Sequence, residues 1–196
     1  MSKIAIYGGA FNPPTLGHYH IIEQIFKNSS IEKIIIVPDG VRLDKEYFIN
    51  KEDRFELINI FIKELNQKGY NIELNNHFFE GKNDSDTTTY EVDKYFINKL
   101  GFEPYHVFGT DISGGIKNWS GNPNKYVEKK VKKIFVPRGG SIFNDYDLEN
   151  YELLNTDSQT DISSTKVRNN IANNKNINKF VSIEIKEYII ERNLYK

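Results

Sequence analysis

Four consecutive branched residues, Ile34-Ile35-Ile36-Val37, place the strongest constraint on the fold of this chain. A strand with one face in water alternates apolar and polar residues, whereas this run, closed by Pro38, is apolar throughout. Such a strand is buried on both faces, as in a parallel sheet with helices on either side. A chain of 196 residues is long enough to bury a core of this kind in one domain.

Candidate strands and helices alternate along the chain. Strands are expected at 3–7, 31–37, 71–79, 105–108 and 133–137, and helices at 18–26, 51–65, 89–100, 111–119, 163–171 and 183–193. This alternation predicts right-handed βαβ units, and so an α/β fold with a Rossmann-like, doubly wound parallel sheet. We expect a single domain over 1–196, including a C-terminal helical segment from about 163. Ligands of such sheets bind at the carboxyl ends of the strands.

Composition excludes several classes of protein. The chain has 26 basic and 27 acidic side chains, and a net charge of -1 argues against a protein that wraps nucleic acid. It has no cysteine, which excludes disulfides and thiolate metal sites. No apolar run is long enough to span a membrane, and 1–7 lacks the features of a signal peptide. We expect a cytoplasmic protein with no membrane partner; the sequence leaves a homo-oligomer open.

A glycine-rich loop follows the first expected strand. Gly8 and Gly9 allow the backbone to approach a ligand closely, and the loop then leads to the start of a helix. Free N–H groups and the helix dipole favour phosphate at such a position. A turn with capping residues is the simpler interpretation of a glycine pair, but the whole string Gly8–His18 is more specific than that.

Two polar side chains stand at the start of this helix. Thr15 and His18 are three residues apart, so they can point to the same place and donate to phosphate oxygens. Gly17 between them is expected to keep the path to the ligand open. His20, His77 and His106 lack a metal-ligand spacing with a nearby carboxylate, and we treat them as structural or surface residues.

A second hydroxyl-rich string begins a helix near the other end of the chain. Ser163, Ser164 and Thr165 offer hydroxyl and backbone N–H groups at a helix start, which forms a nest for anionic oxygens. Arg168 lies one turn further on and can add a charged fork. The alternatives are a plain N-cap for Ser163 and a solvated surface charge for Arg168.

Both strings resemble signatures of the nucleotidylyltransferase superfamily. Gly8–His18 is similar to Gly-Gly-x-Phe-[Asp/Asn]-Pro…[Thr/His]-x-Gly-His, and Ile162–Arg168 to Ile-Ser-Ser-Thr-x-[Ile/Val]-Arg. Four further segments resemble the bacterial nicotinate-mononucleotide adenylyltransferase family. They are Phe108-Gly109-Thr110-Asp111 followed by Trp119, Thr89-Tyr90-Glu91-Val92, Val136-Pro137-Arg138-Gly139-Gly140, and the closing Val181-Ser182-Ile183…Tyr188-Ile189…Leu194-Tyr195.

The resemblance implies a nucleotidylyltransferase fold and transfer of AMP from ATP to nicotinate mononucleotide, with release of pyrophosphate. The attacking phosphate is anionic at neutral pH, so the reaction needs no protein nucleophile. Catalysis then depends on positioning two polyanions and neutralising charge at the α-phosphate. Mg²⁺ enters with ATP, and no protein metal site is expected. The expected partners are ATP and the mononucleotide, without nucleic acid.

The resemblance also implies a role for each matching residue. His18 and Thr15 are the expected catalytic pair. The expected ATP-binding residues are Gly8, Gly9, Ala10, Phe11, Gly17, Gly109, Asp111, Arg138, Ile162, Ser163, Ser164, Thr165 and Arg168. The expected mononucleotide-binding residues are Asn12, Arg42, Lys45, Thr89, Tyr90 and Trp119. Trp119 is expected to stack on the nicotinate ring; the alternative is that it anchors the core. The alternative for Asp111 is that it caps the N-terminus of the next helix. The alternative for Arg42, Lys45 and Arg138 is that each is a surface charge.

Three departures from the family pattern keep alternatives open. Thr15 stands where many relatives have a first histidine, and 39–45 lacks the usual Pro-Pro-His-Lys run. Glu91 replaces a threonine near the expected position of the nicotinate carboxylate, where a like charge is unfavourable. The alternative acceptors are therefore nicotinamide mononucleotide, phosphopantetheine or a sugar phosphate. An alternative of another class is a nucleotide-binding sensor without turnover.

Overall fold

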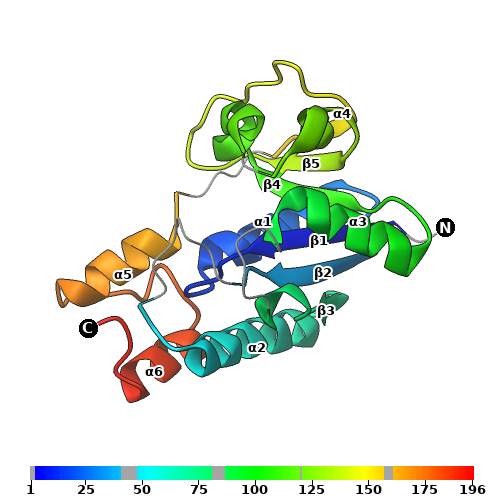
Figure 1. The fold of residues 1–196 in the computed structure, drawn as a ribbon. Helices are drawn as coiled ribbons and strands as arrows, with labels where there is room; N and C mark the ends of the chain where they lie inside the picture. The colour runs from blue at the N-terminus through cyan, green and yellow to red at the C-terminus, as the bar shows by residue number, and fades with distance from the viewer. Residues whose placement is uncertain (1–2, 41–47, 81–86, 120, 157–160) are drawn as a thin grey trace.

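The fold is built on one six-stranded sheet with all strands parallel, in the order β3-β2-β1-β4-β5-β6 (Figure 1). The computed structural model describes residues 3–40, 48–80, 87–119, 121–156 and 161–196. The strands are β1 (Ile4–Gly9), β2 (Lys33–Pro38), β3 (Ile72–Leu74), β4 (Tyr105–Gly109), β5 (Lys132–Val136) and β6 (Tyr151–Leu153). This order confirms the predicted Rossmann-like, doubly wound sheet, with its switch point between β1 and β4.

Helices connect the strands from β1 to β5 and follow β6, whereas residues 137–150 join β5 to β6 without a helix. They are α1 (Leu16–Asn28), α2 (Lys51–Gln67), α3 (Thr89–Leu100), α4 (Tyr126–Lys129), α5 (Ser164–Ala172) and α6 (Ile183–Glu191). Local capping sets several of their ends: Asn50 accepts from the N–H of Asp53 at the start of α2, and Ser163 from the N–H of Lys166 at the start of α5. Gly101 ends α3 with a φ of 75°, as its C-cap position predicts.

Besides helix ends shifted by about two residues and the unpredicted α4, the structure differs from the sequence-based elements in four places. β1 continues through Gly9, which pairs with Pro38, whereas the glycine pair was expected to end the strand. The strand expected at 71–79 covers only Ile72–Leu74, and a 3₁₀ turn follows at Phe78–Glu80. The helix expected at 111–119 is a 3₁₀ helix over Thr110–Asn118. Strand β6 was not predicted, because its three residues are all exposed and are too few to define an apolar pattern.

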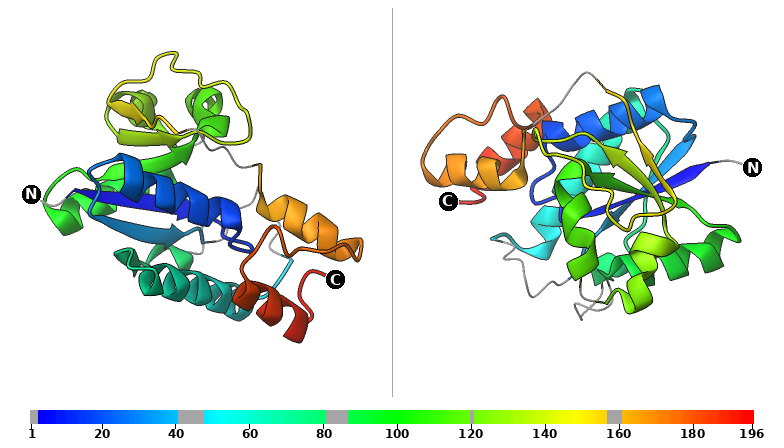
Figure 2. Two further views of the ribbon diagram at one scale, coloured as in Figure 1. Left: turned by 180° about the vertical axis from the view of Figure 1, so that it is seen from behind. Right: turned by 90° about the horizontal axis from the view of Figure 1, so that it is seen from above.

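The apolar run in β2 is buried on both faces, as its lack of alternation predicts. Ile34 and Ile36 are fully buried in a cluster with residues of α1 and α2, whereas Ile35 and Val37, each 2% exposed, pack in a second cluster with residues of α3. Figure 2 shows α1 and α3 on opposite sides of the sheet. Two helical layers thus enclose the central strands, and the carboxyl ends of these strands remain as the place for a site.

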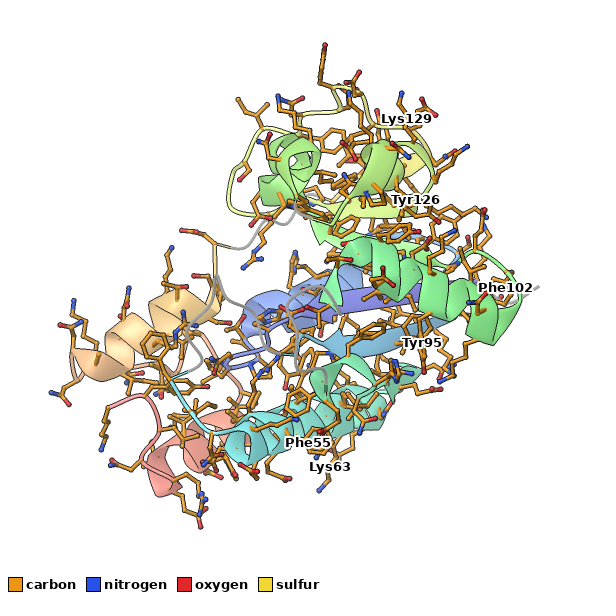
Figure 3. The ribbon with its side chains drawn as sticks, viewed as in Figure 1. Phe55, Lys63, Tyr95, Phe102, Tyr126 and Lys129 are labelled. Carbon is orange, nitrogen blue, oxygen red and sulfur yellow. The ribbon has the colours of Figure 1, made fainter. Side chains whose placement is uncertain are left out.

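A buried polar chain joins α3, β4 and α4. The Nε2 atom of His106 lies 2.9 Å from Oδ1 of Asp93, and the hydroxyl of Tyr126 donates to Oδ2 of Asp93 at 2.8 Å. Tyr126 is labelled beside α4 in Figure 3. Asp93 and His106 are 2% and 4% exposed, so these hydrogen bonds satisfy polar groups that water does not reach. His106 thus has a buried structural partner, although it also lines the cavity described below, and these hydrogen bonds fix α3 against the sheet.

The burial of β2 generates a stability prediction. Ile36→Ala removes a fully buried side chain and should lower the free energy of unfolding by about 2–5 kcal/mol in urea titrations. The matched control is Ile190→Ala on α6, where the side chain is 61% exposed, and a change within about 0.5 kcal/mol is expected. Equal effects of the two substitutions would contradict the described packing of β2.

Candidate active site

A cavity of about 1040 Å³ lies at the carboxyl ends of the central strands. Its walls include the end of β1, the loop that follows it, and the ends of β2 and β4. This is the switch point of the sheet, where the connections after β1 and β4 leave for opposite faces and open a crevice. The cavity therefore occupies the position that the strand order predicts for a ligand.

Most of the residues predicted for the site line this cavity. They are Gly8, Gly9, Ala10, Phe11, Asn12, His18, Thr89, Gly109, Asp111, Trp119, Arg138, Ser163, Ser164, Thr165 and Arg168. Four predicted residues do not line it, namely Thr15, Gly17, Tyr90 and Ile162. Arg42 and Lys45 lie outside the described residues. Residues from both ends of the chain are thus brought to one place.

The ring of His18 is oriented by Thr15. The backbone N–H of Thr15 donates to Nδ1 of His18 at 2.9 Å, and the Thr15 hydroxyl lies 2.9 Å from the same atom. Because a backbone N–H can only donate, Nδ1 must accept, and the neutral ring carries its proton on Nε2. Thr15 itself is fully buried. It therefore positions His18, which differs from the direct phosphate contact expected from the sequence.

His18 is neutral across the physiological range. Burial, and then the positive charge of Arg138, lower the pKa of His18 to about 3. A neutral imidazole with its proton on Nε2 is a hydrogen-bond donor that does not titrate between pH 5 and 8. The arrangement can thus offer one fixed N–H donor to an anionic ligand.

Gly17 lies where the start of α1 meets the backbone of Ile162. A Cβ atom at this position would lie 2.6 Å from the carbonyl oxygen of Ile162, closer than real Cβ contacts. Gly17 therefore allows the start of α1 to pack directly against the chain that leads into α5. Gly17 itself does not line the cavity.

The start of α5 is tied to the loop after β1. The hydroxyl of Ser164 donates to the carbonyl of Pro13 at 2.7 Å, and Nη1 of Arg168 donates to the carbonyl of Asn12 at 2.8 Å. Nη2 of Arg168 also donates to the hydroxyl of Thr165 at 3.2 Å. The two signature strings thus form one wall of the cavity, although more than 140 residues separate them.

The loop after β4 packs against the end of β5. Gly109 leaves room for both side chains that follow, because a Cβ there would lie 2.2 Å from Oδ1 of Asp111 and 3.2 Å from Cδ of Arg138 and would displace them. Nη1 of Arg138 lies 3.8 Å from Oδ2 of Asp111, and Nη2 donates to the carbonyl of Ile162 at 3.2 Å. This places one carboxylate and one guanidinium side by side on the cavity wall.

The first turn of α3 forms another part of the wall. Thr87, Thr88 and Thr89 line the cavity, and the Thr88 side chain caps α3 by accepting from the N–H of Glu91. Glu91 itself is exposed and does not line the cavity. Tyr90 packs edge-on against the ring of Tyr126 instead of facing the cavity.

Trp119 lines the cavity and also contacts a small apolar cluster. Its ring lies edge-on to that of Phe108, with 5.7 Å between ring centroids. It packs as a partly buried residue against a cluster that contains Phe135 and Val131. The Trp119 side chain therefore both packs on this cluster and borders the cavity.

Sequence reasoning missed Arg54, which holds two loops of the site. Arg54 is 5% exposed; its Nε donates to the carbonyl of Ala10 at 2.7 Å and its Nη2 to the carbonyl of Asp39 at 2.6 Å. Its guanidinium also lies 4.9 Å from the ring centroid of Phe79. The apolar periodicity of a helix does not indicate which of its charged residues is buried against a distant loop. Asp39 lines the cavity and could have been found, because it directly follows a predicted strand.

Two negative findings concern the described residues alone. Within them, no group of three or more His, Cys, Asp or Glu side chains is placed to hold a metal ion. None of the helices in this part of the chain is long and apolar enough to cross a membrane.

The sequence matches the cytidylyltransferase-like family over residues 6–170, and the chain belongs to this family. Two of its relatives carry a more specific name, that of a probable nicotinate-nucleotide adenylyltransferase. One, from Caldicellulosiruptor saccharolyticus, is 30% identical and covers 99% of both chains. The other, from Acholeplasma laidlawii, is 31% identical over 98% of this chain and 97% of the relative. These relatives confirm the resemblance that the signature strings indicate.

Solved structures confirm the fold. The Plasmodium falciparum nicotinic acid mononucleotide adenylyltransferase in complex with NaAD superposes with a TM-score of 0.83 at 24% identity, over 100% of this chain and 98% of the other. The same enzyme in complex with APC gives a TM-score of 0.79 at 23% identity, with the same coverage.

The low pKa of His18 generates a prediction about acid stability. In the unfolded chain the imidazole titrates near pH 6.5, whereas in the folded chain its pKa is about 3. The unfolded chain therefore binds a proton first, and stability is lost as the pH falls from about 6.5 toward 3. Between pH 7.5 and 5.0 the wild type should lose about 2 kcal/mol more than His18→Gln.

The measurement is urea unfolding of both proteins at the two pH values. All other titratable groups are common to both, so the difference between the two pH dependences isolates His18. Parallel pH dependences would mean that His18 is already protonated in the folded protein near pH 5.

Proposed function

We propose that this protein transfers AMP from ATP to nicotinate mononucleotide and so forms nicotinate adenine dinucleotide and pyrophosphate. One observation carries the proposal: the N-terminal turns of α1, α3 and α5 all contribute to the wall of a single cavity. Helix N-termini present free N–H groups and a positive dipole, so the cavity suits two polyanionic substrates. The names of the relatives support the same reaction.

The triphosphate of ATP lies along the wall shared by α1 and α5. Ser163, Ser164 and Thr165 supply hydroxyl and N–H donors there, and Arg168 adds positive charge. Gly109 and Asp111 contact the ribose, since a carboxylate can accept from both hydroxyl groups, and Arg138 faces the same nucleotide. Mg²⁺ enters as part of the substrate, chelated by ATP phosphates.

His18 donates from Nε2 to the α-phosphate as its charge develops in the transition state. The contact of Thr15 with Nδ1 supports this assignment, because it fixes both the ring and the tautomer. The mononucleotide phosphate attacks, the bond between the α- and β-phosphates breaks, and pyrophosphate leaves with that electron pair. No protein nucleophile takes part, and positioning supplies most of the rate enhancement.

The mononucleotide occupies the half of the cavity between the loop after β1 and α3. Asn12 lies at its phosphate, and Trp119 stacks on the pyridinium ring, a flat cation that suits an aromatic face. The ring carboxylate lies at the N-terminal turn of α3, near Thr89. The position of Glu91 supports the acid over the amide, because the residue is exposed to solvent and does not line the cavity.

The deciding assay is pyrophosphate release from ATP and Mg²⁺ with nicotinate and nicotinamide mononucleotides in parallel. The helix N-terminus should favour the carboxylate by about 10- to 30-fold in kcat/KM. A preference for the amide would contradict the acceptor assignment but keep the chemistry. No turnover with either compound would contradict the proposed function, with phosphopantetheine as the next acceptor to test and a nucleotide-binding sensor as the remaining alternative.

His18→Ala provides the catalytic control for this assay. Loss of one preorganised donor should lower kcat by about 10²–10³, with the folded state retained. His77→Ala is the matched control, since His77 is exposed and outside the cavity, and it should leave kcat unchanged.

Trp119→Ala tests the stacking role. It should raise KM for the mononucleotide about 5- to 30-fold, because a cation lying on a desolvated aromatic face is stabilised by about 1–2 kcal/mol. KM for ATP should change less than about twofold, measured with the mononucleotide saturating. Equal increases in both KM values would assign Trp119 to the apolar cluster alone.

A further inference from the structure

The chain returns to the active site at its C-terminal end. After α6, Leu194 and Tyr195 are both 7% exposed and belong to the main apolar cluster. The C-terminus lies beside α5 in both views of the molecule from the side (Figures 1 and 2). The hydroxyl of Tyr195 donates to Oδ1 of Asn12 at 2.6 Å, across a separation of 183 residues. The roles proposed above for the site residues do not include this contact.

Two hydrogen bonds hold Asn12, one at its backbone carbonyl and one at its side-chain Oδ1, and they leave its Nδ2 group available. Its carbonyl accepts from Nη1 of Arg168, and its Oδ1 accepts from Tyr195. The residue is 2% exposed and lines the cavity. Among the described residues, none accepts a hydrogen bond from its Nδ2. An amide whose oxygen is already bound presents its NH₂ group as the remaining donor.

Tyr195 is suited to hold this amide in one orientation. Burial raises the pKa of Tyr195 well above its ordinary value, although the positive charges of Arg168 and Arg54 act in the opposite direction and Asp53 adds to the increase. The phenol is therefore a permanent donor. The backbone of Tyr195 has a φ of 64°, a left-handed conformation that a bulky residue rarely adopts without support from its surroundings.

We propose that Tyr195 is a positioning residue that binds Oδ1 of Asn12 and thereby directs the Nδ2 donors of Asn12 to the phosphate of the acceptor mononucleotide. This inference rests on the proposed function, since it assigns a ligand to the Asn12 amide. Without the phenol the amide can rotate and present its oxygen, which repels a phosphate. The C-terminal residues thus determine the affinity for one substrate and not for the other.

Tyr195→Phe is the direct test, because it removes only the hydroxyl. KM for the mononucleotide should rise about 3- to 10-fold, the range expected for one net hydrogen bond, while kcat and KM for ATP change less than twofold. The matched control is Tyr188→Phe on α6, whose hydroxyl donates to Oδ1 of Asp53 at 2.8 Å outside the cavity. This control should lower the melting temperature at least as much as Tyr195→Phe does, but it should leave KM for the mononucleotide and KM for ATP unchanged.

A double-mutant cycle separates positioning from anchoring. In an Asn12→Ala background, Tyr195→Phe should have no further effect on KM for the mononucleotide, because the amide that it orients is gone. Additive effects, or equal changes in both KM values, would overturn the proposal and leave Tyr195 as an anchor of the chain end. Wild-type activity is measured first, and an inactive wild type contradicts the proposed function. If the wild type is active and Tyr195→Phe leaves KM for the mononucleotide unchanged, only the positioning role is contradicted.

Discussion

Backbone carbonyl groups at the carboxyl edge of the sheet need hydrogen-bond donors, and arginines supply them. Loops that leave parallel strands lose their ladder partners, yet buried carbonyls must be satisfied. Arg54 from α2, Arg138 after β5 and Arg168 from α5 each donate to the carbonyl of a segment beside the cavity. These contacts fix the loops in space, so the donors of the site are preorganised before any ligand arrives. Two of the arginines, Arg138 and Arg168, also line the cavity, where a guanidinium can bind an anionic group of the proposed substrates.

The central part of this arrangement could be predicted because its signals are local. The unalternated run 34–37 indicated a strand buried on both faces, and Gly8–His18 indicated a strand, a ligand-binding loop and a helix start. The hydroxyls at 163–165 similarly marked the beginning of α5, where Ser163 is the N-cap. Periodicity and capping act over a few residues, so a single sequence carries them directly.

Other parts of the site depend on contacts between distant segments, which no local pattern encodes. The buried Arg54 has the sequence signature of an ordinary helical residue, and Gly17 is required only because Ile162 approaches it. Thr15 was expected at the phosphate, but its place in the fold turns it toward His18. The Tyr195–Asn12 pair spans nearly the whole chain. Such pairings become visible only when the tertiary structure brings the segments together.

The two edges of the sheet are formed by its shortest strands, β3 (Ile72–Leu74) and β6 (Tyr151–Leu153). An edge strand exposes unpaired N–H and C=O groups to which a foreign strand can add, and short edge strands are one way in which natural sheets limit this hazard. Each edge here offers only three residues, too few for a long intermolecular ladder. The longest strands, β1 and β2, lie inside the sheet. The same strand order that creates the ligand crevice therefore also protects the protein from aggregation through its sheet.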